Sequence, residues 1–583
     1  MKQKLENEIL LIIKNKYNIV VDKLWLREPP KKEIGDFAFN CWVLAKGLKK
    51  NPNLIAEEIL SDINWIDIID ISVIDGSYIN IKLNKNLFSN LFNSIYSDKD
   101  NLIWNKEYNN KTIVIDYIWA NVWKPMHIWH MCTPNQWQVL INLYKKLWYK
   151  VISDSHIWDW GIIFGKLILA YKLWWDENKL KENAVDYLLE LYIKITEETE
   201  KDELLEQKIR NEFKLLSKGD SDSVKLWKIF TSFSIDAMKT QFDRLNIEYD
   251  YDIWESFYEW LNLPKMQNYP DLKWDMHSIV NELIEKWIAT QNNDNSVWVE
   301  FDKNTKIPSC VLQKRDWTHW YLASDVAWIK YRMDNWNPEK IVYFIDSRQQ
   351  LHLKQAFTIA KNAWWLDNTE LFHAFNWFIS LKDGAMSSRK GRIIKLDKLL
   401  DEAESRAEKI ILEKREDIEW EELKNLSKII WIWAIKYWYL KKSREIDVIF
   451  DWDEFMSFEW NSGPYIQYAY VRSIRILEKA NYDTIDTLNN DWKLEFSEEI
   501  ELIKIIWNYD DILVKVTKTN SPHILCKYTY DLTKAFNSFY NNIHILSEED
   551  ENKKIMRLKI VELFWLVLKD SFKILGIDMP DKM

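Results

Sequence analysis

The sequence predicts an α/β protein of three domains: a small N-terminal α/β domain, a Rossmann-type α/β domain and a C-terminal all-α helical bundle. Two observations support this prediction. A strand–helix–strand pattern begins at residue 111, and from about residue 400 to the end the pattern is almost wholly helical. With 583 residues, 47% of them hydrophobic, the chain can form several separate cores.

The first domain is expected over residues 1–105, where short helical and strand patterns alternate. The second is expected over residues 106–400. It opens with the strand KTIVIDY (111–117), a helix that starts near Pro125 and the strand YKVIS (149–153). This order predicts a βαβ unit of the kind that binds nucleotides.

Three further strand patterns, at 297–301, 308–313 and 340–346, are expected to complete the parallel sheet. The segment from about 175 to 245 is charged and periodic at helical spacing, which predicts a helical insertion with a solvated face. Residues 401–583 form the third domain, the helical bundle.

Composition limits the class of protein. The formal net charge of -11 argues against indiscriminate nucleic-acid binding, although a local basic face can still hold RNA. Apolar runs such as 9–13 are too short to cross a bilayer, so we expect a cytoplasmic protein without a membrane segment. The four cysteines lie far apart without a CxxC pair, which predicts buried reduced thiols and no structural metal.

The balance of tryptophan and glycine is abnormal, with 35 tryptophans against 10 glycines, although glycine is normally about 7% of residues. Trp148 follows a helix end in LYKKLWYKVI (143–152), whereas the similar junction FKILGIDMP (572–580) carries Gly576. We hypothesise that the gene reads UGA as glycine and that the printed sequence reads UGA as tryptophan. The alternative, a tryptophan-rich surface that stacks ligands, leaves the missing glycines unexplained.

The segment ANVWKPMHIWH (120–130) follows the first strand of the βαβ unit and opens its helix, where we expect His127 and His130 on one helix face. Two histidines at this spacing could be metal ligands or core residues. A helix N-terminus directly after a strand favours phosphate instead. The segment resembles the HIGH signature of class I aminoacyl-tRNA synthetases, with Trp129 in place of the family's glycine. The resemblance implies an ATP site, with Mg²⁺ accompanying ATP and Lys124 near the phosphates.

A second segment, KDGAMSSRKGRIIKL (382–396), is rich in hydroxyls and cations and is bounded by glycines. It resembles the KMSKS loop of the same class, which closes over ATP and stabilises the α-phosphate during transfer. Ala385 and Ser388 stand where the general signature has lysines. The resemblance therefore leaves open which cation acts, and implies an ATP contact by Met386, Ser387, Ser388, Arg389 and Lys390.

Recognition of a guanidinium requires carboxylates placed for bidentate hydrogen bonds and an aromatic wall. The segments IWESFYE (253–259) and YLASDVA (321–327) resemble the amino-acid site of arginyl-tRNA synthetases, as do Asn121 and the segment SRQQLHLKQ (347–355). HIWDWGIIFG (156–165) resembles the same family, with Trp158 in place of a glycine. The resemblance implies arginine binding by Asn121, Glu255, Tyr321, Asp325 and Gln349.

The terminal regions resemble the same family. FDWDEFMSFEWNSGPYIQYAYVR (450–472) and CKYTYDLTKAFNSFY (526–540) resemble its helical anticodon-binding domain, and GSYIN (76–80) resembles its N-terminal domain, which grips the tRNA elbow. Aromatic residues at helical spacing can equally be core residues. The resemblance implies tRNA contacts by Tyr78, Asn80, Tyr465 and Tyr468.

The resemblance covers nearly the whole chain and implies an arginyl-tRNA synthetase that uses ATP, L-arginine and tRNA(Arg), which we expect to be a monomer. Two alternatives remain: a catalytically impaired tRNA-binding paralogue if Trp129 is genuine, and a nucleotidyltransferase that shares the HIGH signature. The UGA hypothesis predicts tryptophan in the native protein at 160 and 298, and glycine at 123, 129, 148, 158, 317 and 460.

Overall fold

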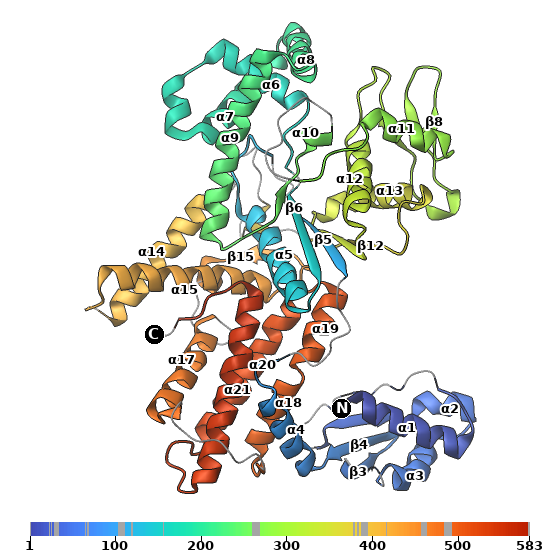
Figure 1. Cartoon of the computed structure of the whole chain (residues 1–583), viewed down its shortest axis with the longest axis vertical. Helices are drawn as coiled ribbons and strands as arrows, with labels where there is room; N and C mark the ends of the chain where they lie inside the picture. Colours follow the sequence, from blue (N-terminus) through green and yellow to red (C-terminus); the bar gives the residue numbers. More distant parts are fainter. Residues whose placement is uncertain are drawn as a thin grey trace. The chain divides into compact units, whose positions relative to one another are not determined.

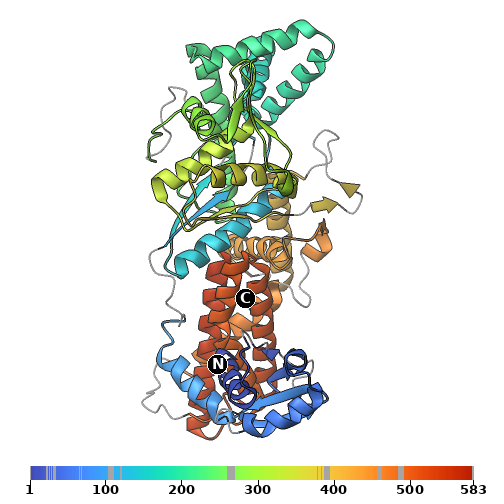
Figure 2. The same cartoon turned by 90° about the vertical axis from the view of Figure 1, so that its right-hand side faces the viewer.

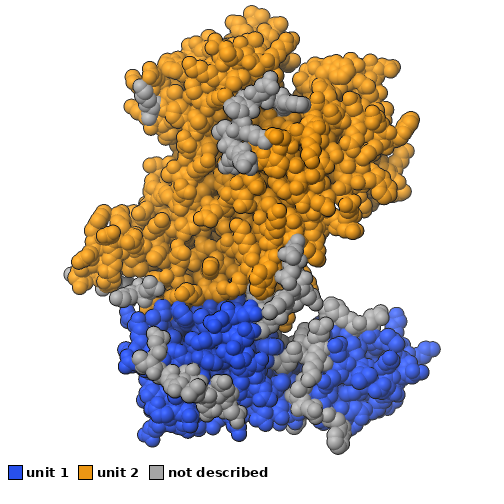
Figure 3. All heavy atoms as spheres, in the orientation of Figure 1, with its two compact units in different colours: residues 1–102, 472–509, 531–567 blue, residues 103–471, 510–530, 568–583 orange. Residues whose placement is uncertain are grey.

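The structure is a computed structural model of the whole chain. It describes all residues except 1, 22–23, 25, 28, 30–33, 65, 67–68, 103–110, 118–120, 156, 259–268, 377–378, 382–383, 386–393, 416, 456–462, 483–491 and 581–583. The chain forms two compact units (Figure 3). Unit 1 comprises residues 1–102, 472–509 and 531–567, and unit 2 comprises residues 103–471, 510–530 and 568–583.

Unit 1 contains an antiparallel four-stranded sheet in the order β1-β2-β4-β3. Gly76, at φ 60°, forms the tight turn of the β3–β4 hairpin, where a residue without Cβ is unstrained. Tyr96 of α4 donates a hydrogen bond to Glu562 on a C-terminal helix of the same unit. The elements of the N-terminal segment are β1 (Leu26–Arg27), β2 (Phe37–Asn40), β3 (Ile69–Asp75), β4 (Tyr78–Leu83), α1 (Lys2–Tyr17), α2 (Trp42–Leu48), α3 (Pro52–Ile63) and α4 (Lys85–Ser97).

Unit 2 is built around a five-stranded, wholly parallel sheet in the order β12-β11-β5-β6-β7 (Figure 1). The order reverses between β5 and β11, as in doubly wound nucleotide-binding folds. The apolar runs of β5 and β11 are buried, which is typical of strands covered on both faces. The strands are β5 (Thr112–Tyr117), β6 (Lys150–Ser155), β7 (Tyr251–Asp252), β11 (Lys340–Tyr343) and β12 (Glu370–His373).

Two expected strands do not join this sheet. The patterns at 297–301 and 308–313 form β9 (Val297–Val299) and β10 (Cys310–Gln313), which pair antiparallel with each other, and β9 also pairs with β8 (Ala289–Gln291). The prediction that they complete the parallel sheet was therefore wrong. Only the pattern at 340–346 supplies a parallel strand, β11.

The helix of the βαβ unit, α5 (Ile128–Lys146), begins three residues after the expected start at Pro125. The expected insertion near 175–245 is helical and gathers at one end of unit 2 in both views (Figure 1, Figure 2). Its helices α7 (Glu177–Thr199), α8 (Glu203–Ser217) and α9 (Ser221–Arg244) pack with α6 (Ile162–Trp174).

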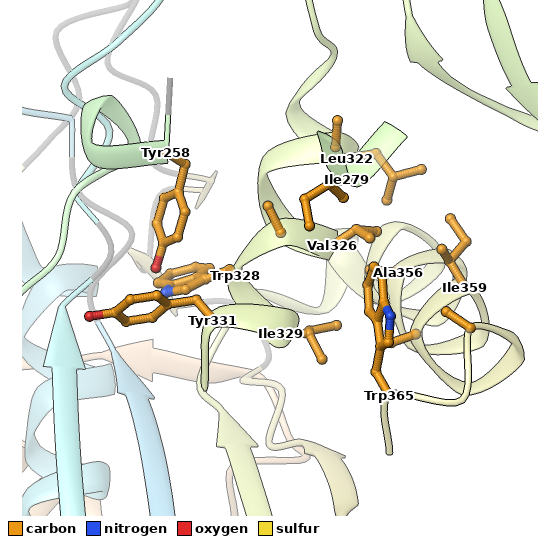
Figure 4. Packing of buried hydrophobic residues seen from close by; sticks show 14 of the residues in the cluster. Tyr258, Ile279, Leu322, Val326, Trp328, Ile329, Tyr331, Ala356, Ile359 and Trp365 are labelled. Carbon is orange, nitrogen blue, oxygen red and sulfur yellow. The ribbon is translucent and has the colours of Figure 1, made fainter. Parts of the chain in front are cut away.

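Helix α12 (Tyr321–Trp336) is buried along most of its length and packs against α13 (Gln350–Asn362). Tyr258, Trp328 and Tyr331 lie together on one side of α12, and Val326 faces Ala356 of α13 on the other side (Figure 4). This packing fixes α12 between the sheet and α13. Nearby elements are α10 (Glu255–Tyr258), α11 (Met276–Glu285), η2 (Lys303–Thr305) and η3 (Ser347–Gln349).

The C-terminal part is mainly helical, as expected. Divisions between the two units follow residue 102 and fall within the helices α17, α19, α20 and α21. Its elements are α14 (Leu396–Lys414), α15 (Trp420–Leu440), α16 (Trp452–Phe455), α17 (Gly463–Lys479), α18 (Ser497–Trp507), α19 (Tyr509–Thr519), α20 (His523–Asn542) and α21 (Glu551–Leu575), with a small sheet of β13 (Ile379–Leu381), β14 (Gly384–Ala385) and β15 (Val448–Phe450).

All four cysteines are buried free thiols, as predicted. Among the helices of the described residues, none has the length and apolar content needed to span a bilayer.

Candidate active site

Segments that carry several of the expected site residues follow the carboxyl ends of four parallel strands, the edge where doubly wound sheets bind ligands. Asn121 follows β5, Glu255 opens α10 directly after β7, and Gln349 ends η3 after β11. The loop 157–161 follows β6. The strand order therefore brings together segments that are more than 200 residues apart in sequence.

The two histidines lie at the N-terminus of α5. His127 is the N-cap residue and His130 lies in the first turn, and their side chains lie together, with ring centroids 4.1 Å apart. The backbone N–H of His127 donates to Nδ1 of His130 at 3.0 Å, which leaves the proton of a neutral His130 on Nε2.

Both imidazoles are neutral at pH 7. Burial, with the charge of Lys124, lowers the pKa of His127 to about 4, and burial lowers the pKa of His130 well below its usual value. Nδ1 of His127 is buried and has no hydrogen-bond partner within the described part of the chain. A neutral imidazole with an unused polar atom at a helix N-terminus fits a phosphate oxygen.

The second signature, residues 386–390, lies outside the described residues, but the segments on either side of it contact the start of α5. On one side, the indole Nε1 of Trp129 donates to the carbonyl of Ile379 in β13 at 2.9 Å. On the other side, the N–H of Ile128 donates to the carbonyl of Ile394 at 3.1 Å, and the N–H of Leu396 donates to the carbonyl of Met126 at 2.9 Å. The segments that flank the second signature therefore meet the helix terminus that carries the first.

Two buried carboxylates, Glu255 and Asp325, lie beside Tyr321. Their residues are only 4% and 5% exposed. Burial and the charge of Glu255 raise the pKa of Tyr321, and Asp325 lies one turn along α12 from Tyr321. Buried carboxylates are costly unless they meet a cation or hydrogen-bond donors, so this arrangement suits a positively charged ligand.

An aromatic pair adjoins the carboxylates. The rings of Trp158 and Tyr321 are stacked at 6.3 Å between centroids. Trp158 also forms a parallel bridge with Asn121. The bridge and the stack connect the loop after β5 to the start of α12, so four of the five expected arginine-binding residues occupy one region.

Two residues that the sequence did not single out hold these groups. Asp159 accepts hydrogen bonds from the backbone N–H of Ser256 at 2.9 Å and from its hydroxyl at 2.5 Å, which fixes the start of α10 beside Glu255. His352 of α13 is hydrogen-bonded through Nε2 to Oδ2 of Asp325. Both lie inside segments quoted for other residues, but only the fold reveals their partners.

A buried ion cluster anchors α12 to the sheet. Arg332 donates to Asp154 of β6 at 2.7 Å and to Asp116 of β5 at 3.3 Å, and all three side chains are fully buried. Although burial opposes its charge, the two aspartates raise the pKa of Arg332. The helix that carries Tyr321 and Asp325 is thereby fixed to the two strands that precede the site.

The expected RNA contacts differ in exposure. In unit 1, Tyr78 is 43% exposed, whereas Asn80 is 6% exposed, so its side chain lies within the sheet domain. In unit 2, Tyr468 is 59% exposed, and Tyr465 lies with its ring centroid 6.0 Å from that of Tyr530.

Several tryptophans adopt a conformation that favours glycine. Among the described residues, Trp148, Trp287, Trp317 and Trp364 have φ between 58° and 68°. Trp287 follows the end of α11, and its neighbour Ile288 donates to the carbonyl of Leu283 at 2.9 Å. The equivalent bond closes α21 at Gly576, where φ is 65° and the N–H of Ile577 donates to the carbonyl of Phe572 at 3.0 Å. The conformations expected for Trp148 and Trp317 are therefore present.

Comparisons with known proteins agree along the chain. Residues 92–452 match the family model described as "tRNA synthetases class I (R), catalytic domain". Residues 466–583 match the "DALR anticodon binding domain", and residues 1–83 match the "Arginyl tRNA synthetase N terminal domain".

Curated relatives extend the match to the full length. An arginine–tRNA ligase of Clostridium botulinum is 34% identical over 581 residues, covering 99% of this chain and 100% of the relative. One from Fusobacterium nucleatum is 34% identical, covering 95% of this chain and 94% of the relative. The arginyl-tRNA synthetases of Plasmodium falciparum (22% identity, TM-score 0.80) and Thermus thermophilus (19%, 0.77) share the fold, each over 100% of this chain and at least 99% of their own.

These matches do not favour a nucleotidyltransferase, which gives no reason for a matched anticodon-binding domain, nor an impaired paralogue. The matched catalytic, anticodon-binding and N-terminal regions account for nearly all of the sequence. The chain therefore belongs to the class I arginyl-tRNA synthetase family.

Proposed function

We propose that this chain is an arginine–tRNA ligase. It activates L-arginine with ATP to arginyl-adenylate and pyrophosphate, and then transfers arginine to the terminal 2′-OH of tRNA(Arg). The observation that carries the proposal is the pair of buried carboxylates, Glu255 and Asp325, at the strand edge that also bears the helix terminus with His127 and His130. We further propose that the enzyme acts as a cytoplasmic monomer and that Mg²⁺ accompanies ATP.

The N-terminus of α5 is the proposed phosphate site. Neutral His127 and His130 donate hydrogen bonds to phosphate oxygens, and Lys124 supplies a cation beside them. The loop of Met386, Ser387, Ser388, Arg389 and Lys390 closes on the same site and supplies further cations, which stabilise charge on the transferring phosphate. In the proposed native form, glycine at 129 leaves room for adenine.

The carboxylates are the proposed specificity site. Glu255 and Asp325 receive the guanidinium, Tyr321 forms its wall, and Asn121 and Gln349 hold the amino and carboxylate ends of arginine. A neutral isostere would leave buried carboxylates without a cation, which is a large penalty, so no editing site is required.

The three regions are proposed to divide the work. Residues 1–105 grip the tRNA elbow through Tyr78 and Asn80, and residues 106–400, with the insertion near 175–245, carry the chemistry. Residues 401–583 bind the anticodon through Tyr465 and Tyr468, and the exposed ring of Tyr468 can stack on bases.

The test is pyrophosphate–ATP exchange by the full-length chain made with glycine at 123, 129, 148, 158, 317 and 460. We expect exchange with arginine and tRNA(Arg) present. Lysine and citrulline are the control amino acids. Lysine keeps the positive charge but lacks the planar guanidinium, and citrulline keeps the planar shape but lacks the charge. Equal exchange with either of them would refute the specificity site.

A further inference from the structure

One contact joins the two helices of the proposed arginine site. His352 lies on α13, one turn after Gln349, and its Nε2 is hydrogen-bonded to Oδ2 of Asp325 on α12. The Asp325 side chain is 7% exposed and that of His352 is 25% exposed. Among the described residues, Oδ1 of Asp325 receives no hydrogen bond.

The chemistry of this contact fixes its direction. An ionised carboxylate only accepts, so Nε2 of His352 carries the donated proton. A donor on Oδ2 restrains rotation of the carboxylate and leaves Oδ1 for a second donor. A planar guanidinium needs an acceptor in a defined orientation, which a freely rotating carboxylate would not provide.

We propose that His352 is a positioning residue for arginine selectivity: it holds Asp325 so that Oδ1 faces the guanidinium. The inference rests on the proposed function, in which Asp325 binds arginine. Because Gln349 is the N-cap residue of α13, the helix that carries His352, the same bond sets the distance between the residues that hold the two ends of arginine.

Two substitutions separate donation from packing. His352→Gln keeps an N–H at about the reach of Nε2, whereas the amide of His352→Asn is too short to reach Oδ2. In the exchange assay, we expect His352→Asn to raise the KM for arginine about tenfold, the loss of one hydrogen bond to a charged group, with the KM for ATP within about twofold. His352→Gln should stay within about threefold of the parent. If His352→Asn does not fold, His352→Leu replaces it.

A double-mutant cycle with Asp325→Asn tests whether His352 acts through Asp325. We expect His352→Asn to add less than about twofold to the arginine KM of Asp325→Asn, because the bond it supports is already lost. An unchanged KM in His352→Asn, or the same increase in both backgrounds, would overturn the inference.

The cycle also separates this inference from the proposed function. If Asp325→Asn alone leaves the arginine KM unchanged, the assignment of the arginine site is wrong. If Asp325→Asn raises it and His352→Asn does not, only the role of His352 is wrong.

Discussion

Replacing Trp287 and Trp364 by glycine should stabilise the chain as printed. Both residues follow a helix end at φ 60° and 58°, and they are 95% and 89% exposed. A residue with a Cβ costs about 1–2 kcal/mol in the left-handed conformation. Replacing it by glycine removes this cost, but about 0.5–1 kcal/mol of the gain is lost because glycine makes the unfolded chain more flexible. Indoles this exposed contribute little burial, so the net gain is roughly 0.5–1 kcal/mol per site.

The double variant should therefore gain roughly 1–2 kcal/mol. Unit 2 is larger than 150–250 residues, for which each kcal/mol raises Tm by about 2–4 °C, so we expect a smaller rise in Tm per kcal/mol. Thermal unfolding followed by circular dichroism at a fixed scan rate measures the shift. The matched control is Trp298→Gly, which lies in β9 and is 40% exposed. Glycine weakens a strand, so its Tm should fall. A fall in Tm for the double variant, or an equal rise for the control, would refute the conformational argument.

Two further changes test the buried charges. Arg332→Met should destabilise the protein by about 3–5 kcal/mol in denaturant unfolding, because it leaves two buried carboxylates without their cation. The control Arg210→Met removes an exposed ion pair and should cause no measurable change. Equal effects of the two substitutions would contradict this prediction. Burial lowers the pKa of Lys436 to about 7, so the folded state binds fewer protons than the unfolded state between pH 7 and about 10.5, and stability should rise with pH across that window. Lys436→Met should flatten this rise, and an unchanged slope would show that Lys436 is not its source.

The parallel core was predictable because its strands are continuous apolar runs with few alternatives. The run at 111–117 and that at 340–346 are buried in β5 and β11, as two covered faces require. The segment at 297–301 also predicts a strand, but its alternate residue Trp298 is exposed. Alternation of buried and exposed residues is typical of an antiparallel strand with one solvated face. The apolar pattern therefore predicted that 297–301 is a strand, but not which strands it pairs with.

The site was predictable in its residue types and less so in its connections. Tyr321 and Asp325 are one helical turn apart, so their proximity follows from sequence. The bond from His352 to Asp325 depends on how α12 packs against α13, and Arg332 and Asp154, which form an ion pair, are 178 residues apart in sequence. Such contacts have no local signal in a single sequence.

The last prediction concerns native peptides, and the structure sharpens which tryptophans decide it. Mass spectrometry of the protein from its source should find glycine at 287 and 364 as well as at the six positions predicted from sequence, and tryptophan at 160 and 298. Backbone conformation argues for glycine at 148, 287, 317 and 364, since a bulky residue is strained at positive φ. Packing supplies a second argument for glycine, at three other positions. The buried Nε1–H groups of Trp254, Trp431 and Trp433 lack an acceptor among the described residues, a cost that genuine buried indoles usually avoid. Position 460 lies outside the described residues. At 129 neither argument applies, because Trp129 is helical and its indole is hydrogen-bonded. Peptides with glycine at the four strained sites and tryptophan at 129 would overturn the reassignment at the ATP site alone, and such a protein should bind ATP poorly.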